Sequence, residues 1–133
     1  MTEPHRDLRT HPVHLGLGAT VVPQPEFAGM PWYEAYSART ADDGAEGRLV
    51  SLYEFTQSWD SWEMHPAGDE LVVCLAGEMT LIQEHPDGSF HSQALRPFEY
   101  AINPAGTWHT ADLAMPATAL FVTAGTGTRH RPR

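Results

Sequence analysis

Imidazole and carboxylate side chains gather in two short segments of this chain, residues 63–70 and 104–109. The side chains that could bind a metal are Glu63, His65, Glu70 and His109. Two His and two Glu are enough for a mononuclear divalent metal site that leaves coordination positions open for a small molecule. These donors suit Fe, Mn, Zn, Ni or Cu, and the absence of a nearby thiolate disfavours a structural zinc site.

Tight turns beside strand ends would bring these side chains to one place. A Pro-Ala-Gly turn at 66–68 separates His65 from Glu70, so two adjacent strands can direct both side chains to a common point. A second Pro-Ala-Gly turn, at 104–106, comes just before His109. This convergence predicts one divalent metal ion per chain. The plainer alternative is that His65 and Glu70 close a turn by a hydrogen bond and that His109 is an unrelated core residue.

Strand alternation also predicts which residues line the site. Alternate residues of a strand face the same side, so Glu63 and His65 share a face. Trp59 and Ser61 have the same parity and are predicted to line the cavity. Cys74 lies in an apolar strand. It is expected to be a buried structural thiol and a further side chain beside the cavity.

Short strands separated by turns account for most of the chain from residue 48 onward, and no long helical period is evident. This pattern is typical of a β-sandwich or barrel. Earlier in the chain, the aromatic segment 32–36 is interpreted as a strand and residues 41–47 as an exposed polar loop. The later strands are expected at residues 48–55, 59–65, 71–76, 78–84, 89–95, 100–102, 107–111 and 118–123.

The length of 133 residues fits one domain. Several prolines favour an extended N-terminal arm over residues 1–30 rather than a helix. The barrel domain is expected over residues 31–125. The basic C-terminal tail, residues 126–133, is interpreted as a solvated terminus.

The strand at residues 71–76, Leu-Val-Val-Cys-Leu-Ala, is apolar on both faces. A strand of this kind is covered on both sides. Either the N-terminal arm or a second subunit would cover its outer face. The sequence therefore predicts a homodimer whose interface includes the arm.

Composition restricts the partners. The net charge of −9 argues against a general nucleic-acid-binding protein, which needs a basic face. All eight basic residues are Arg, which excludes Schiff-base chemistry on a lysine side chain. The single Cys suits a reducing cytoplasm. The start has no signal-peptide shape, and no apolar run approaches the roughly 20 residues that span a bilayer, so a cytoplasmic protein without membrane contact is expected.

The spacing of these residues resembles that of the cupin superfamily. Its first motif runs Gly, five residues, His-x-His, three or four residues, Glu, six residues and Gly. Its second runs Gly, five residues, Pro-x-Gly, two residues, His, three residues and Asn. The resemblance covers about residues 57–113. The residues of this chain that match are His65, Glu70 and Gly77 in the first motif and Pro104, Gly106 and His109 in the second.

The resemblance implies an all-β fold, a double-stranded β-helix (jelly-roll) barrel with the metal inside. Gln57, Phe98 and Leu113 stand where the motifs have Gly, Gly and Asn, at turn or outer positions. Glu63 stands where the first motif has its first metal-binding His, and that departure bears on the site. Some cupins use Glu as a ligand at this position.

Glu63 therefore has three interpretations. It is a fourth metal ligand, a catalytic general base beside a three-ligand metal, or a structural acid in a site without a catalytic metal. A second carboxylate ligand would make the site harder and more anionic, which favours Mn or Fe over Cu.

These features predict a metal-dependent enzyme that acts on a small neutral or weakly polar metabolite. Isomerase, cyclase, lyase and dioxygenase chemistry all fit, because a fold does not fix a function. The metal would act as a Lewis acid, or as an oxygen-activating centre if it is iron. The alternatives are a non-enzymatic module that binds a small ligand or metal, and a metal-free epimerase-like protein that uses a His as general base.

Overall fold

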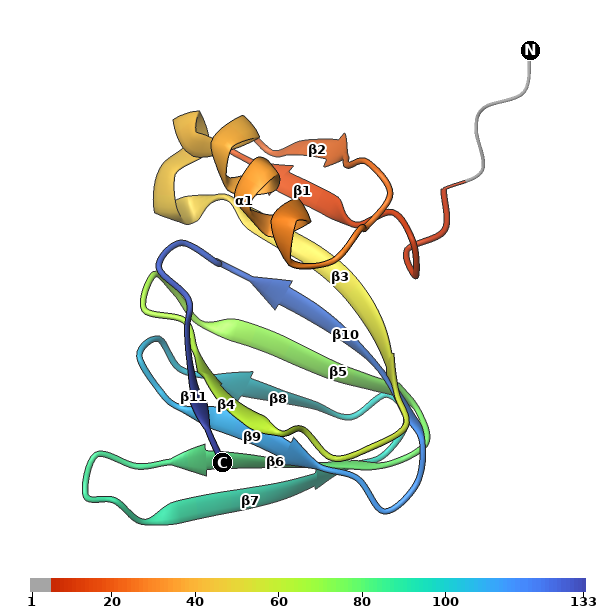
Figure 1. Ribbon diagram of the computed structural model, residues 1–133, viewed down its shortest axis with the longest axis vertical. Helices are drawn as coiled ribbons and strands as arrows, with labels where there is room; N and C mark the ends of the chain where they lie inside the picture. Colours follow the sequence, from red (N-terminus) through yellow and green to blue (C-terminus); the bar gives the residue numbers. More distant parts are fainter. Residues whose placement is uncertain (1–5) are drawn as a thin grey trace.

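Two antiparallel β-sheets face each other in the computed structural model, which describes residues 6–133 (Figure 1). The larger sheet has the strand order β2-β1-β3-β10-β5-β8 and the smaller one β11-β4-β9-β6-β7. Within the described residues no strand pairing joins the two sheets. The strands are β1 (Val13–Gly16), β2 (Thr20–Pro23), β3 (Arg48–Phe55), β4 (Ser61–Met64), β5 (Glu70–Ala76), β6 (Met79–Glu84), β7 (Phe90–Leu95), β8 (Tyr100–Asn103), β9 (His109–Asp112), β10 (Ala117–Thr123) and β11 (Arg129–Pro132).

Alternation along the strands places the core between the sheets. In β5 and β10, buried residues alternate with half-buried ones, as the apolar patterning of these segments requires. The all-β jelly-roll prediction is confirmed. The core residues are Val72, Cys74, Met79, Leu81, Leu95, Ala101, Ala111, Ala117, Ala119 and Phe121.

The prediction of a strand at 32–36 is wrong, because this segment lies in helix α1 (Met30–Arg39). Pro31 occupies the first turn, where its missing N–H costs no hydrogen bond. Trp32 and Tyr36 are four residues apart and stack with ring centroids 5.5 Å apart. That spacing fits both the strand period and the helix period, and burial of both rings on one helix face decides for the helix.

The residues after α1 also differ from the prediction, since Ala41–Glu46 forms a 3-10 helix instead of an irregular loop. No helix within residues 6–133 has the length and apolar character needed to cross a membrane.

The N-terminal segment belongs to the larger sheet and is not a separate arm. β1 and β2 form a hairpin, and β1 pairs with β3. His14 on β1 is buried and contacts the Tyr36 hydroxyl and the Asp43 carboxylate at 2.6 Å each. These contacts tie the hairpin to α1 and to the 3-10 helix. Residues 1–5 of the predicted arm lie outside the described residues.

The basic tail forms strand β11, although most of its residues are exposed to solvent. β11 pairs with β4 at the edge of the smaller sheet. The Arg131 guanidinium lies over the rings of Trp62 and Trp108, 5.3 Å and 4.5 Å from their centroids, and pairs with Glu84. Cation–π contacts and an ion pair therefore hold the tail against the barrel.

Two turns show how the motif positions shape the chain. Gly77 has φ 73°, and a Cβ atom there would lie 1.9 Å from the carbonyl oxygen of Pro116. Only glycine fits this position. Phe98 also has a positive φ, 74°, where the motif has Gly. A non-glycine residue in this region costs about 1–2 kcal/mol, so the chain carries local strain at this exposed turn.

Candidate metal centre

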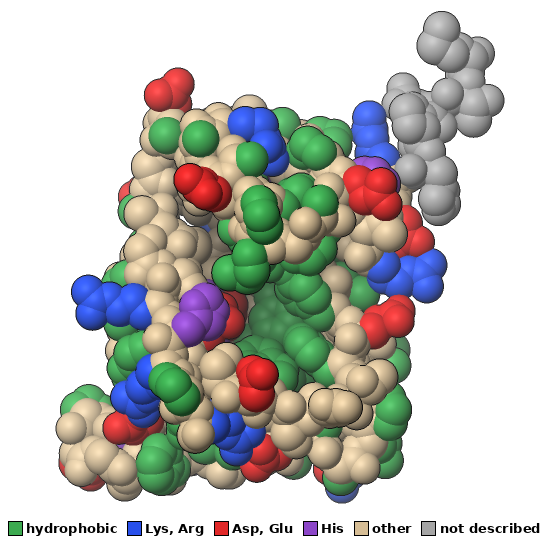
Figure 2. All heavy atoms as spheres, in the orientation of Figure 1, with side chains coloured by type: hydrophobic (Ala, Val, Ile, Leu, Met, Phe, Trp, Pro, Cys, Tyr) green, Lys and Arg blue, Asp and Glu red, His purple; other side chains and the backbone are tan. Residues whose placement is uncertain are grey.

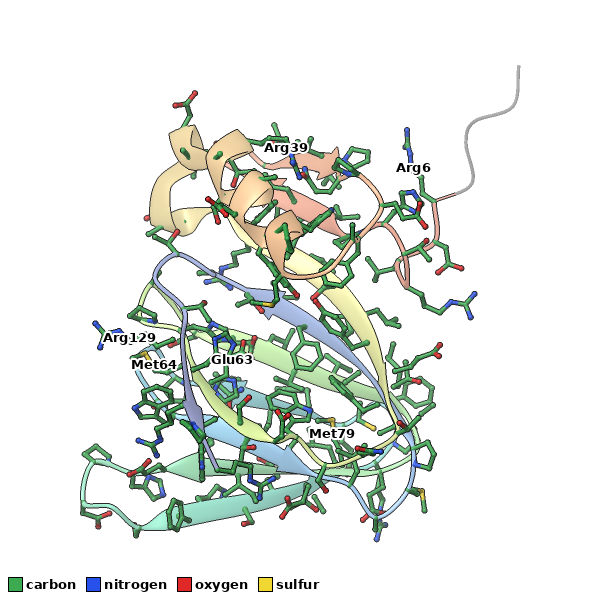
Figure 3. All side chains as sticks on the ribbon, viewed as in Figure 1. Arg6, Arg39, Glu63, Met64, Met79 and Arg129 are labelled. Atoms are coloured by element: carbon green, nitrogen blue, oxygen red, sulfur yellow. The ribbon has the colours of Figure 1, made fainter. Side chains whose placement is uncertain are left out.

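The four predicted metal-binding residues come together between the sheets. One donor atom from each of Glu63, His65, Glu70 and His109 lies within 4.8 Å of the others. The Nε2 atom of His65 lies 2.9 Å from Glu63 Oε1 and 3.0 Å from Glu70 Oε2. The Nε2 atom of His109 lies 3.3 Å from Glu70 Oε1. Figure 3 shows Glu63 directed between the sheets and Met64, the next residue, on the outer side.

Strand register in the smaller sheet explains part of this convergence. Glu63 on β4 lies directly opposite His109 on β9 and opposite His130 on β11. Residues opposite each other on one face of a sheet have adjacent side chains. The second Glu63 oxygen accordingly lies 3.6 Å from His130 Nε2. His130 was not among the predicted site residues, because the all-polar tail carries no apolar alternation that would mark a strand.

Hydrogen bonds at Nδ1 fix the orientation of both imidazoles. The Thr128 hydroxyl donates to the Gly125 carbonyl at 2.8 Å, so it accepts from the His65 Nδ1–H, also at 2.8 Å. The His109 Nδ1–H donates to the Thr107 carbonyl at 3.3 Å. Both rings therefore present Nε2 to the carboxylates, as metal-binding histidines do.

Glu70 is held by two donors from outside the cluster. The Asn103 amide donates to Oε1 at 3.0 Å and the Thr123 hydroxyl donates to Oε2 at 2.6 Å. Gln83 in turn donates to the Asn103 side-chain oxygen at 2.8 Å, which fixes the amide orientation. The sequence analysis missed these three residues. Of the three, only Asn103 could have been recognised in the sequence. It directly precedes the second Pro-Ala-Gly turn, and strand alternation places its side chain on the inner face.

The donor set and its unpaired atoms fit a divalent ion. The Nε2 atoms of His65 and His109 are buried, and neither has an aligned hydrogen-bond partner. Carboxylate oxygens nevertheless lie 2.9–3.3 Å away. Oxygens this close, but off the direction of the ring N–H, make poor hydrogen-bond acceptors. They are placed as further ligands of a common ion would be. Two imidazole nitrogens and up to two carboxylates also match the ligand preferences of Mn, Fe and Zn.

The charges of the cluster also favour a cation. Burial lowers the pKa of His65, but the Glu63 and Glu70 carboxylates outweigh it and raise this pKa to about 9. Burial lowers the pKa of His109, which stays neutral. Burial opposes ionisation of Glu70, yet contact with His65 lowers its pKa overall. A proton on His65 thus offsets part of the carboxylate charge, and a metal ion would displace this proton.

The other predicted site residues lie at different depths. Trp59 is half-buried, and its ring centroid lies 6.2 Å from that of His109. Ser61 is also half-buried, and its carbonyl accepts a hydrogen bond from the Thr110 hydroxyl at 2.9 Å. Cys74 has no exposed surface and packs in the core, so it does not reach the cavity.

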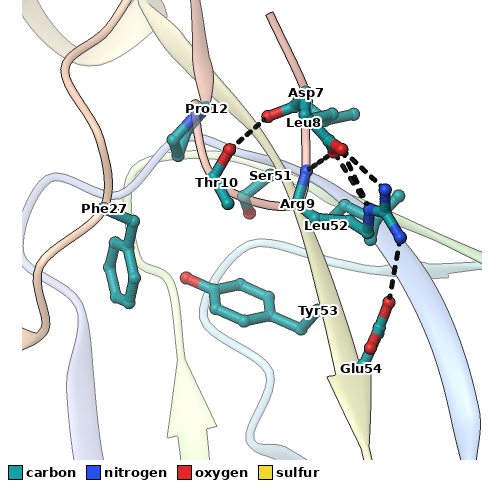
Figure 4. Close-up of a pocket in the computed structure, with 10 residues that line it drawn as sticks. All are labelled: Asp7, Leu8, Arg9, Thr10, Pro12, Phe27, Ser51, Leu52, Tyr53 and Glu54. Atoms are coloured by element: carbon teal, nitrogen blue, oxygen red, sulfur yellow. Dashed lines mark hydrogen bonds and ion pairs between the residues drawn. The ribbon is translucent and has the colours of Figure 1, made fainter.

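Hydrophobic side chains line a hollow in the face shown in Figure 2. A pocket of about 400 Å³ lies between residues 7–12 and strand β3, where the rings of Phe27 and Tyr53 lie edge to face (Figure 4). None of the four clustered residues lines that pocket. Arg9 at its edge is paired with Asp7 at 2.6 Å. The pocket is therefore a crevice beside the N-terminal segment and not the candidate metal centre.

No family model and no curated relative matches this chain. Solved structures do. A recombinant oxalate oxidase in complex with glycolate is 15% identical with a TM-score of 0.55, over 62% of this chain and 45% of that one. The hydroquinone 1,2-dioxygenase of Sphingomonas sp. TTNP3 with bound 4-hydroxybenzoate is 16% identical with a TM-score of 0.51, over 57% and 58%. The hydroquinone 1,2-dioxygenase PnpCD in complex with Cd²⁺ and 4-hydroxybenzonitrile is 16% identical with a TM-score of 0.50, over 57% and 56%.

These similarities concern the fold alone. The chain spans less than half the length of the oxalate oxidase and under two thirds of either dioxygenase. The facing sheets, the two motifs and the structural matches agree with one another. This chain therefore has the cupin fold.

Proposed function

We propose that this protein binds one divalent metal ion through Glu63, His65, Glu70 and His109 and is an enzyme acting on a small molecule. The main support is the pair of buried imidazole Nε2 atoms without aligned hydrogen-bond partners, both facing carboxylate oxygens. Two carboxylates make the donor set hard, which favours Mn or Fe, with Zn and Ni as further candidates. A bound ion of this kind would supply Lewis-acid chemistry.

The two carboxylates have different environments and therefore different roles in this proposal. Glu70 is 3% exposed and carries two donated hydrogen bonds, so it is a fixed anchor. The Glu63 side chain is 29% exposed, and among residues 6–133 its second oxygen has one ion-pair contact, with His130. Glu63 thus lies at the open side of the cluster, where a small molecule would enter. Access of this kind supports an enzyme over a closed structural site, with isomerase, cyclase, lyase or dioxygenase chemistry as candidate reactions.

The metal-free alternative has less support. Where a carboxylate orients a general-base His, it does so through an aligned hydrogen bond. His65 lies close to two carboxylates, but neither oxygen lies along its ring N–H direction. The single barrel domain over residues 31–125, a cytoplasmic location and the absence of a nucleic-acid partner stay predictions from the sequence.

Metal analysis of the wild-type protein tests the proposal. Protein purified without chelator is expected to contain about one equivalent of divalent metal per chain. Chelator treatment should remove the metal and lower the melting temperature. Returning Mn²⁺ at about 100 times its dissociation constant should restore about 2.7 kcal/mol of stability. Protein that holds no metal and shows no Mn²⁺-dependent melting shift would contradict the proposal.

We also propose that the protein is a homodimer, because the outer face of the larger sheet is apolar. Tyr100 and Ile102 on β8 are 59% and 53% exposed beside the apolar strand β5. Ile102→Glu should therefore give a monomer in light scattering at micromolar concentration. Phe90→Glu on β7 of the smaller sheet, at a 61% exposed phenylalanine, is the control and should leave the dimer intact. A monomeric wild-type protein would remove the argument.

A further inference from the structure

Aromatic rings form one wall of the space beside the candidate metal centre. Phe55 at the end of β3 and Trp59 have ring centroids 5.5 Å apart, and Phe121 on β10 lies 6.0 Å from Phe55 and 6.2 Å from Trp59. Trp59 also contacts the His109 ring edge to face, at 6.2 Å. The aromatic wall, defined as Phe55, Trp59 and Phe121, therefore runs up to a candidate metal ligand.

The exposure of Phe55 and Trp59 shows that this part of the wall faces open space, while Phe121 behind them is buried. Phe55 and Trp59 pack against the buried core cluster, yet both are only half-buried. Side chains inside a filled barrel would be fully buried, as Leu81 and Val72 are. The hollow lined by hydrophobic side chains in Figure 2 is consistent with this. A flat ring in such a space can stack or pack edge to face on several aromatic partners, each worth a measurable gain in affinity.

A pair of hydroxyls adjoins the aromatic wall, and one of the two residues, Tyr53, also lines the crevice beside the N-terminal segment. Tyr33 on α1 and Tyr53 on β3 are hydrogen-bonded through their hydroxyls, and Tyr53 contacts Phe121 with centroids 5.8 Å apart. Burial raises the pKa of both hydroxyls, with smaller contributions from the Glu63 and Glu70 charges, so both hydroxyls stay protonated. The pair uses one hydroxyl proton internally and can donate the other to a ligand oxygen.

The arginines of residues 6–133 add no unpaired positive charge to this space, because Arg133, which donates to the Trp59 backbone carbonyl at 2.9 Å, pairs with Asp112 at 2.7 Å. All eight basic residues are Arg and lie within residues 6–133. Seven of them are exposed, and Arg131 is held on the outside by Trp62, Trp108 and Glu84. The candidate metal centre does not supply positive charge either, because two carboxylates neutralise a divalent ion held by two neutral imidazoles. An anionic ligand would lose hydration among aromatic rings without gaining a counter-charge.

We propose that this cavity binds an uncharged aromatic molecule that carries a hydroxyl or carbonyl oxygen. Its ring packs on the aromatic wall, and its oxygen accepts a hydrogen bond from the Tyr33–Tyr53 pair or lies towards Glu63. The placement of the ligand beside the metal centre rests on the proposed function. The preference for a neutral aromatic ring depends on the cavity walls alone.

Calorimetric titration of the Mn²⁺-loaded protein with four small probes tests the ligand class. Phenol should bind about tenfold more tightly than cyclohexanol, which has the same hydroxyl and a similar size but no π-system. 4-Hydroxybenzamide should bind at least about tenfold more tightly than 4-hydroxybenzoate, which differs mainly in charge. Equal affinities within either pair, or tighter binding of the anion, would overturn the inference.

Variants locate the binding site. Phe55→Leu keeps the apolar character but removes a ring, and it should weaken phenol binding about tenfold. Phe90→Leu, at an exposed phenylalanine that stacks on Trp62 outside the barrel, is the control and should bind as the wild type does. Tyr53→Phe removes only a hydroxyl and should weaken phenol binding, whereas Tyr100→Phe on the outer face should not. Equal behaviour of a variant and its control would overturn the assignment.

Repeating the titrations after chelation separates this inference from the proposed function. A preference for phenol and for the neutral amide that persists in metal-free protein supports the inference even if the protein proves not to bind metal. Loss of both preferences in protein that still binds one metal ion contradicts the inference and leaves the proposed function standing.

Discussion

His109→Ala is expected to abolish the retention of divalent metal, and His65→Ala should have the same effect. Each variant removes one of two imidazole donors and leaves two carboxylates with a single nitrogen ligand. Loss of an outer partner of a metal ligand already costs about 10–100-fold in affinity, so loss of a ligand should cost more than about 100-fold. The measurement is elemental analysis after gel filtration, together with the melting temperature with and without Mn²⁺.

His14→Ala is a matched control for these variants. His14 is 2% exposed, close to the 4% of His65, and it contacts Tyr36 and Asp43 far from the cluster. Its loss should lower stability because two polar partners remain without it, but metal content should stay that of the wild type. Wild-type metal content in both His65→Ala and His109→Ala would refute the site.

Strand patterning allowed much of the barrel to be predicted from the sequence. The strand at Arg48–Phe55 has the predicted bounds, and β5 begins one residue earlier than expected, at Glu70. β5 alternates between buried and half-buried residues in the structure, whereas its sequence is a short continuous apolar run bounded by turn residues, which is typical of a strand covered on both faces. The Pro-Ala-Gly turns between them were likewise readable, because each position requires a particular backbone shape.

The elements around the barrel were harder to predict, for physical reasons. In α1, the residues that pack on the sheet, Trp32 and Tyr36, have a spacing that a strand would also allow. In β11, the residues are all polar or proline, so hydrophobic patterning says nothing. What holds β11 is pairing with β4 and the stacking of Arg131 on two tryptophans. Contacts of that kind depend on residues far apart in the sequence.

The same limit applies to the candidate site. His65, Glu70 and His109 were recognisable because motif spacing marks them. Their partners come from elsewhere: Thr128 orients His65 across 63 positions in the chain, and Thr123 reaches Glu70 across 53. A threonine has no spacing signal of its own. Such supporting residues become visible only when the sheets are assembled.

Glu63→Gln is expected to weaken metal binding about 10–100-fold, or about 1.4 kcal/mol for each factor of ten. The variant keeps the size of the side chain but removes its charge. Glu63 Oε1 lies 2.9 Å from His65 Nε2, on the side where the other ligands converge, which supports the ligand interpretation. The loss should be smaller than for either His variant. The Glu63 side chain is 29% exposed and lacks donated hydrogen bonds like the two that fix Glu70, so it is the less firmly held ligand.

Glu84→Gln is the matched control for this charge removal. The Glu84 side chain is 25% exposed, lies on β6, which β9 separates from β4, and pairs with Arg131 outside the cavity. Its replacement should leave the metal affinity unchanged and cost only the modest stability of a surface ion pair, about 0–1 kcal/mol. A loss of metal affinity in both variants would indicate a general effect of net charge rather than a ligand at position 63.

Parallel metal titration and turnover measurements on Glu63→Gln separate the three interpretations of this residue. A ligand predicts weaker metal binding together with altered activity. A free general base predicts intact metal binding and a loss of about 10²–10⁴ in turnover. A structural acid predicts neither, only reduced stability. The ligand interpretation has a further consequence, because removing one carboxylate charge leaves the loaded centre with a net positive charge. Glu63→Gln should then bind 4-hydroxybenzoate more tightly relative to 4-hydroxybenzamide than the wild type does, and an unchanged ratio would count against a ligand at this position.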